Sequence, residues 1–108
     1  MEQIYTVADQ LKLLGDKTRL TMMVMLKERA LCVCDLADLL ETSQPNASQH
    51  LRKLKAAGLV NEARRGQWIY YSLHVDDKPY IRVILDGLPS LKEKVELIKE
   101  DCNSLFGG

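Results

Sequence analysis

Residues 43–59 have the sequence SQPNASQHLRKLKAAGL, which contains the start, the buried face and the end of one helix. Ser43 is a typical N-cap residue, and Pro45 follows in the first turn, where its missing N–H costs little. Gly58 predicts a left-handed C-cap, and the apolar Leu59 follows it. The apolar residues share one face: Ala47, Leu51, Leu54 and Ala57. We therefore predict a helix that ends at Gly58 and packs through this face.

The opposite face of this helix is small, polar and basic. At about 100° per residue it carries Pro45, Gln49, Arg52 and Ala56. Gln can pair with adenine and Arg with guanine in a major groove, and a helix N-terminus favours phosphate. His50 projects to the side of the buried face, where a structural or phosphate-contact role is favoured over metal ligation. The candidate DNA-binding residues on this helix are Ser43, Gln44, Ser48, Gln49, Arg52 and Lys53.

A shorter helix is predicted just before this one, from about Cys32 to Glu41. Its buried residues are Val33, Leu36, Ala37 and Leu40, at helical spacing. Thr42-Ser43 then forms a tight link. Two helices joined by so short a link, the second with a basic face, predict a helix-turn-helix over residues 32–58.

Two β-rich runs follow, Leu59–Arg64 and Gln67–Leu73, joined around Arg65-Gly66. They predict a hairpin over residues 59–73, with Arg64 and Arg65 as further DNA-binding residues at its basic tip. A helix-turn-helix followed by a hairpin is a winged helix.

The remaining segments predict four more helices. The first ends at Gly15, and the second begins after the N-cap Asp16. Met22, Met23 and Met25 lie in the second helix, where filling of gaps in the core is favoured over binding of a soft metal. Another helix begins at Asp76 or Asp77 and is kinked or ended by Gly87 and Pro89. A last one starts at the capping box of Ser90 and Glu93.

The predicted fold class is mainly α with a small β-hairpin, in the order ααααββα(α). At 108 residues the chain forms one domain, 1–108, with 46% apolar and 28% charged residues. No apolar run approaches the length of a membrane span, and no targeting segment is visible. We therefore expect a cytoplasmic protein without a membrane partner.

The formal net charge is zero, which at first argues against nucleic acid as a partner. The distribution of charge favours it, because binding follows the local field. Acidic residues gather in the C-terminal third of the chain. Residues 50–65 contain one acid, Glu62, against five bases: Arg52, Lys53, Lys55, Arg64 and Arg65.

The three cysteines are Cys32, Cys34 and Cys102. A reducing cytoplasm disfavours structural disulfides, so a close pair with an odd third thiol indicates metal or redox chemistry. The pair lies at a predicted helix N-terminus, which lowers a thiol pKa. Thiolates select soft ions, whereas Asp35 is a hard ligand. The count fits a three-thiolate centre better than a closed zinc site.

On an intact helix Cys32 and Cys34 lie about 200° apart. They cannot bind one ion unless the first turn unwinds. Ion capture is therefore expected to distort the third helix and to move helix 43–58 through Thr42-Ser43. The chain contains no catalytic motif that competes with this interpretation, so we do not expect an enzyme.

Several blocks in a fixed order resemble the ArsR/SmtB family of metal-responsive winged-helix repressors. The resemblance implies a homodimer joined through its first and last helices, residues 1–15 and 76–108. It also implies an ion-free form that binds a palindromic operator and an ion-bound form that releases it. The blocks are Leu14-Gly15-Asp16-Lys17-Thr18-Arg19-Leu20, Cys32-Val33-Cys34-Asp35-Leu36, Ser48-Gln49-His50-Leu51, Ala57-Gly58-Leu59-Val60, Arg65-Gly66 and Tyr70-Tyr71-Ser72-Leu73.

The CVCDL block resembles the third-helix site of the arsenite and antimonite sensors, which implies Cys32 and Cys34 as ligands of As(III) or Sb(III). The cadmium/lead branch adds cysteines from an N-terminal arm, and no cysteine precedes Cys32. The zinc and nickel branches use Asp and His on the fifth helix, and residues 80–97 contain no His. The third ligand is Cys102, from the same or the partner subunit, or else an exogenous thiol or water.

The leading hypothesis is a dimeric repressor that leaves operator DNA when As(III) or Sb(III) binds these cysteines, and that needs no cofactor while bound to DNA. A redox- or sulfide-responsive repressor is the first alternative. A cadmium-, lead- or zinc-responsive member of the same family is the second. Outside DNA binding, the chain is compatible with a soluble thiol metallochaperone.

Overall fold

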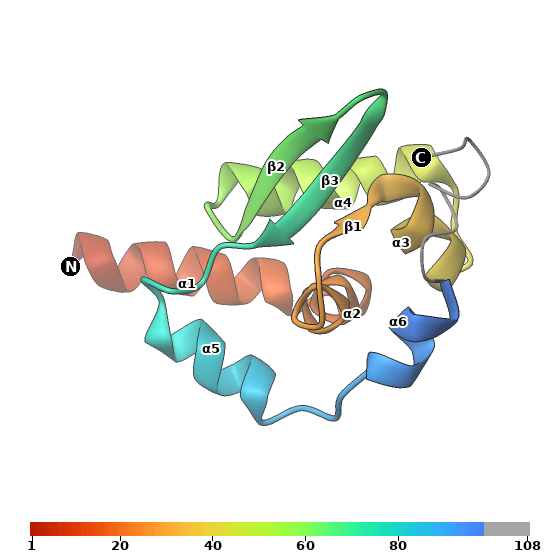
Figure 1. The fold of residues 1–108 in the computed structure, drawn as a ribbon. Helices are drawn as coiled ribbons and strands as arrows, with labels where there is room; N and C mark the ends of the chain where they lie inside the picture. Colours follow the sequence, from red (N-terminus) through yellow and green to blue (C-terminus); the bar gives the residue numbers. More distant parts are fainter. Residues whose placement is uncertain (99–108) are drawn as a thin grey trace.

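Six helices and three short strands make up residues 1–98, the part of the chain that the computed structural model describes (Figure 1). Cys102 lies outside the described residues. The elements are α1 (Glu2–Leu14), α2 (Lys17–Leu26), β1 (Leu31–Cys32), α3 (Val33–Leu39), α4 (Gln44–Ala56), β2 (Val60–Arg65), β3 (Trp68–Leu73), α5 (Pro79–Asp86) and α6 (Lys92–Ile98).

Helix α2 is the centre of the core. Its residues from Met22 to Leu26 are all buried, and the other elements surround it in Figure 1. Met22, Met23 and Met25 are 0% exposed, so the prediction that they fill the core is confirmed. The unbranched methionine side chain adapts to gaps between elements that approach from several directions.

The three strands form one antiparallel sheet in the order β1-β3-β2. The hairpin of β2 and β3 lies against α4, as a winged helix requires (Figure 1). The predicted mainly helical fold with a winged helix-turn-helix is therefore confirmed. The third strand was not predicted. It pairs Leu31 with Tyr71 and Cys32 with Tyr70, and two residues are too few for an alternating pattern to be recognised.

Three predicted helix ends, at Asp16, Ser43 and Gly58, agree with the structure. Asp16 caps α2 by accepting a hydrogen bond from the backbone N–H of Arg19 at 3.0 Å, which lowers the pKa of its carboxyl group. Ser43 caps α4 by accepting from the backbone N–H of Asn46 at 3.2 Å. At the other end of α4, Gly58 has φ +76°, and the N–H of Leu59 reaches back to the Leu54 carbonyl at 3.0 Å.

The third helix differs from the prediction. It begins at Val33, because Cys32 is extended and belongs to β1, and it ends at Leu39. The prediction placed Leu40 on the buried face, but Leu39 is buried and Leu40 is only half-buried. Helix α3 packs against both α4 and α6. Glu41 follows with φ 53°, a left-handed conformation that reverses the chain before α4.

The C-terminal region forms two separate helices. Helix α5 begins at Pro79, later than predicted, and its N-cap position is Lys78. The side chain of Asp77 pairs with Lys78 at 2.8 Å and caps no helix. Residues 87–91 then lead to α6, where Ser90 accepts from the Lys92 N–H at 3.1 Å. Val95 of α6 is 1% exposed, and α6 lies against α3 (Figure 1).

The wing, which is the hairpin of β2 and β3, is attached to α4 by a small polar network. Lys55 of α4 pairs with Glu62 of β2 at 2.8 Å, and the Tyr71 hydroxyl donates to the same carboxylate at 2.6 Å. These hydrogen bonds lower the pKa of Glu62. Burial and the neighbouring carboxylate raise the pKa of Tyr71 to about 12. The network fixes the root of the wing, because it joins β2, β3 and α4 at one point.

Replacing Gly58 by Ala should destabilise the fold by about 1–2 kcal/mol, the cost of a left-handed residue that carries a Cβ. The pocket around Gly58 has space for the methyl group, whose nearest neighbour is the Lys78 Nζ at 4.0 Å. Urea unfolding measures the loss. Gly87→Ala is the matched control, because Gly87 has φ −82° and needs no special conformation. An equal loss in both variants would contradict this account.

Replacing Glu62 by Gln should lower the pKa of Tyr71 from about 12, while burial keeps it above the ordinary value of 10.0. A tyrosine whose pKa is raised by folding stabilises the native state fully below about pH 10, and this stability is lost as the pH rises through about 12. The difference in unfolding free energy between the wild type and Tyr71→Phe should therefore change over this range and be flat below it. Tyrosinate absorbance measures the titration; an unchanged Tyr71 pKa in Glu62→Gln would refute the network.

Candidate metal centre and DNA-binding surface

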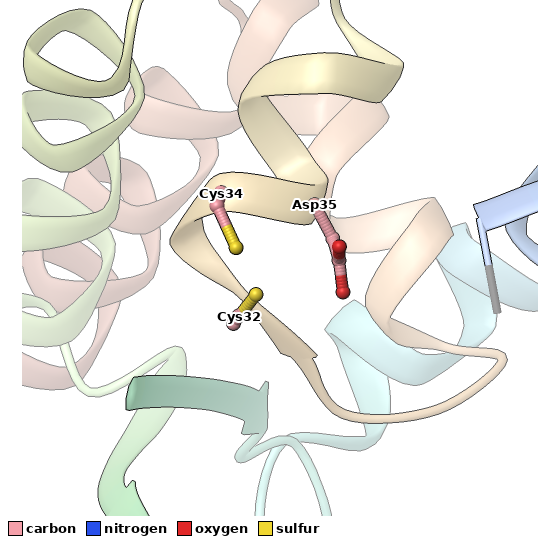
Figure 2. A group of neighbouring side chains, drawn as sticks. All are labelled: Cys32, Cys34 and Asp35. Atoms are coloured by element: carbon pink, nitrogen blue, oxygen red, sulfur yellow. The ribbon is translucent and has the colours of Figure 1, made fainter. Parts of the chain in front are cut away.

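Two cysteine sulfurs and a carboxyl group meet where β1 runs into α3. Cys32 is the last residue of β1 and the N-cap residue of α3, while Cys34 and Asp35 lie in the first turn of that helix. Their Sγ and carboxylate atoms all lie within 4.8 Å of one another. Figure 2 shows the two sulfurs pointing toward each other, with the Asp35 side chain alongside. These three residues could hold a metal ion.

The expectation that the two thiols lie on opposite flanks of a helix is wrong. Cys32 has φ −82° and ψ 163°, which is extended backbone outside the helix. The pairing with Tyr70 keeps it in the sheet, so its side chain is not subject to the 100° step of an α-helix. The two sulfur atoms therefore lie close together without any unwinding of the first turn.

The expectation of a lowered pKa for Cys32 is also wrong. Burial raises the pKa of the Cys32 thiol to about 11, and the Asp35 carboxyl group adds to the increase. The backbone N–H groups of Asp35 and Cys34 act in the opposite direction but do not compensate. Cys32 is 0% exposed, so desolvation of the thiolate outweighs the favourable helix N-terminus.

The donor set fits a soft ion. A metal–thiolate bond is about 2.3 Å long, so two sulfurs on one ion lie about 4 Å apart. The sulfur atoms of Cys32 and Cys34 lie within 4.8 Å of each other here. The carboxyl oxygen of Asp35 is a hard donor of lower affinity for such an ion. Sequence reasoning set Asp35 aside on this ground, yet the structure places it in the cluster, 4% exposed. The Cys102 ligand lies outside the described residues.

Aromatic side chains of β3 surround the thiols. Cys32 forms a small apolar cluster with the buried Tyr70, and Cys34 and Trp68 pack against it half-buried. The guanidinium of Arg65, at the end of β2, lies 4.8 Å from the centroid of the Tyr70 ring. The candidate metal centre therefore touches the wing directly. Sequence reasoning missed this contact because it depends on strand pairing between segments far apart in the chain.

The candidate DNA-binding residues lie on the surface of α4 and on the wing. Ala47, Leu51 and Leu54 are buried on the inner side of α4. Ser48 is half-buried and the other candidates are exposed: Ser43, Gln44, Gln49, Arg52, Lys53, Arg64 and Arg65. Glu62, the one acid of residues 50–65, forms an ion pair with Lys55 and neutralises its charge at the root of the wing. Arg52, Lys53, Arg64 and Arg65 then leave a basic surface, which suits phosphate.

His50 is a residue of α4, is half-buried and contacts Arg19 of α2. Its Nδ1 atom is 3.0 Å from the Arg19 Nη1 atom, so the ring has a protein partner within the same chain. Of the structural and phosphate-contact roles expected for His50, this contact favours the structural one. Of the described helices, none is long and apolar enough to cross a membrane.

Comparisons with known proteins identify the family. Residues 16–62 match the family described as "Bacterial regulatory protein, arsR family". The chain is 40% identical over 89 residues to the arsenic resistance transcriptional regulator ArsR1 of Pseudomonas putida, covering 82% of this chain and 70% of that protein. It is also 40% identical over 89 residues to the arsenical resistance operon repressor of Escherichia coli, covering 81% and 76%.

A solved structure supports the fold. It is the homodimeric winged helix-turn-helix DNA-binding domain of a possible ArsR-family regulator from Mycobacterium bovis, with a TM-score of 0.71 and 22% identity. The match covers 95% of this chain and 87% of that domain. The chain has a winged helix and a basic α4, and its relatives regulate transcription. The protein is therefore a transcriptional repressor and not an enzyme. The chain belongs to the ArsR/SmtB family of transcriptional repressors.

Proposed function

We propose that this repressor binds operator DNA as a dimer and is released when As(III) or Sb(III) binds Cys32 and Cys34. The observation that carries the proposal is the convergence of the Cys32 and Cys34 sulfurs and the Asp35 carboxyl group within 4.8 Å at the start of α3, next to the helix-turn-helix. A protein that controls transcription in this way acts on DNA in the cytoplasm. No cofactor is needed in the DNA-bound form.

Helix α4 is the proposed reader of the operator. Gln49 and Arg52 lie on its exposed face and have the side chains that pair with adenine and guanine in the major groove. Ser43, Gln44, Ser48 and Lys53 hold phosphates at the start and flank of the helix. Arg64 and Arg65 extend the contact from the wing. Each subunit of the dimer thus reads one half of the operator through α4 and makes further contacts with the DNA through the wing.

The dimer is proposed to form through α1 and α5. Both helices expose apolar side chains; Ile4 is 64% exposed and Val83 is 70% exposed. An apolar groove of about 400 Å³ runs along α1 to Tyr80 of α5. A second copy of the chain would cover this surface, which a lone subunit leaves in water. In the wider 76–108 segment, α6 contributes less, because it packs on α3 of its own subunit.

The proposed inducer is a thiophilic ion of the arsenic group. The curated relatives with 40% identity are named for arsenic or arsenical resistance. Two thiolates match such an ion better than they match Mg²⁺, Ca²⁺ or Mn²⁺. Cys102 is proposed as the third ligand, from the same or the partner subunit. An exogenous thiol or water completes the site if Cys102 does not.

Two connections carry the effect of ion capture to the DNA-binding surface. When both cysteines bind arsenite, each As–S bond replaces an As–OH bond, and the hydroxyl leaves with the thiol proton as water. Holding both sulfurs on one arsenic atom shifts the chain at the β1–α3 junction. One connection runs along α3 through Glu41, whose φ of 53° marks the reversal before α4. The other runs from Cys32 to the ring of Tyr70 and from there to Arg65. The reader helix and the wing are displaced together, and no unwinding of α3 is required.

Arsenite should weaken the binding of a duplex that the protein has enriched from a random-sequence pool. Coupling between two sites is typically about 5- to 150-fold in affinity, which is the expected loss. Fluorescence anisotropy measures it, with antimonite, cadmium and zinc tested alongside arsenite. Trp68 is the one tryptophan of the chain and packs against the thiol cluster, so its fluorescence reports ion binding separately.

Cys34→Ser, which changes a half-buried residue, and the Cys32→Ser/Cys34→Ser double variant should keep duplex binding and lose the response to arsenite. Their melting temperatures establish that they are folded. Cys102→Ser should reduce the response if Cys102 is a ligand. Release by arsenite from the double variant at the wild-type concentration would refute the proposed site.

Arg52→Ala or Gln49→Ala should reduce the preference for the enriched duplex over a scrambled one by about 5- to 150-fold, the value of one good base contact. Lys53→Ala should weaken the binding of both duplexes by the same factor. It should also reduce the slope of log affinity against log salt by about one, the value of one phosphate contact. Lys94→Ala, on α6, is the control and should change neither. An unaltered preference in both Arg52→Ala and Gln49→Ala would show that α4 is not the reader.

A further inference from the structure

Arg19 joins three segments of the chain through one side chain and its own backbone. Its backbone N–H donates to Asp16 Oδ1, its Nε donates to the carbonyl of Leu13 at 2.8 Å, and its Nη1 lies 3.0 Å from His50 Nδ1. Leu13 belongs to the last turn of α1, and His50 lies in the middle of α4. The guanidinium therefore links the end of α1 to the reader helix.

The chemistry of this contact determines the state of the His50 ring. A guanidinium has only donors, so the Nδ1 atom of His50 accepts the hydrogen bond. An Nδ1 atom that accepts a hydrogen bond leaves the ring N–H at Nε2. A ring with protons on both nitrogens would place a donor against the Arg19 donor and break the link.

Gln10 makes a second link between the same two helices. Its side chain is 5% exposed, and its Nε2 donates to the carbonyl of Ala57 at 3.4 Å. Ala57 is the C-cap residue of α4. The Tyr80 hydroxyl of α5 donates to the Oε1 of the same Gln10 at 3.0 Å. Both α1 and α5, the helices proposed to form the dimer, thus meet at the end of the reader helix.

The two links define a direction as well as a position. His50 and Ala57 are seven residues apart, about 10 Å along the axis of an α-helix. One attachment point would leave α4 free to pivot, whereas two separated points hold its axis. In Figure 1, α1 and α4 run one above the other across the picture, and α2, which carries Arg19, lies at the end of α1.

We propose that Arg19 and Gln10 are positioning residues that hold the reader helix at a fixed direction relative to the dimer helix α1. This inference rests on the proposed function in assigning the operator to α4 and the dimer to α1. A dimer must present its two reader helices about 34–36 Å apart, one turn of DNA. A pivot of α4 in each subunit moves both readers away from that spacing while the basic surface remains.

The proposal predicts a loss of specific binding without a loss of non-specific binding. His50→Phe keeps a planar ring but removes the acceptor, and His50→Asn keeps an acceptor at the equivalent position. His50→Phe should bind the enriched duplex at least about tenfold more weakly, within the range of a lost base contact, and should bind a scrambled duplex as before. His50→Asn should recover most of the difference. Arg19→Lys keeps the charge but loses the guanidinium group, whose Nε and Nη1 atoms contact Leu13 and His50 together. It should therefore behave like His50→Phe.

The dependence of binding on salt separates this role from a direct contact with DNA. A positioning role leaves the slope of log affinity against log salt unchanged in His50→Phe. A drop of about one in that slope, with equal weakening of both duplexes, would assign His50 to a phosphate and overturn the proposal. Unchanged preference for the enriched duplex in His50→Phe and Arg19→Lys would overturn it as well.

A measurement without DNA tests the same claim even if the protein enriches no duplex, an outcome that would refute the proposed function alone. Residual dipolar couplings of backbone amides give the direction of α4 relative to α1 in the free protein. The direction should change in the His50→Phe/Gln10→Leu double variant and be retained in His50→Asn. The ¹⁵N shifts of the His50 ring should show the proton on Nε2. An unchanged direction in the double variant, or a proton on Nδ1 in the wild type, would overturn the proposal.

Discussion

Two residue pairs, Leu31 with Tyr71 and Cys32 with Tyr70, determine where the thiols of this protein lie. The pairing takes Cys32 out of helix α3, turns its side chain toward Cys34 and buries it against the wing. If residues 31 and 32 were helical, the sulfurs would lie on opposite sides, and an ion could join them only by breaking the helix. The strand instead brings the candidate ligands together at the junction between the sheet and the helix-turn-helix.

This placement joins three functional surfaces in a chain with no net charge. The thiol centre touches the wing through Tyr70 and precedes the reader helix by one short helix. Arg19 and Gln10 connect α1, one of the proposed dimer helices, to α4, the proposed reader helix. A displacement at the candidate metal centre would reach the proposed reader helix, because closely packed elements transmit strain to their neighbours.

Local signals in the sequence were sufficient for the order of the helices and for the fold, although not for the bounds of α3 and α5. Asp16, Ser43 and Gly58 act through neighbours a few residues away, so their roles as caps were predictable. Strand β1 was not predictable, because its two residues are held by partners 38 to 40 positions away. The pKa of Cys32 was misjudged for the same reason: the helix N-terminus is a local feature, whereas burial depends on the whole fold. Asp35 and Arg19 likewise acquire their significance from tertiary contacts.

The account depends on energetic coupling between the thiol centre and the DNA-binding surface, and coupling is reciprocal. The most direct test is the dissociation constant of arsenite, followed by Trp68 fluorescence, for the free protein and for the protein saturated with its enriched duplex. The account predicts that the duplex weakens arsenite binding by the same factor by which arsenite weakens duplex binding. Equal arsenite affinities in the two states would contradict it, because an ion that binds both states equally cannot release DNA.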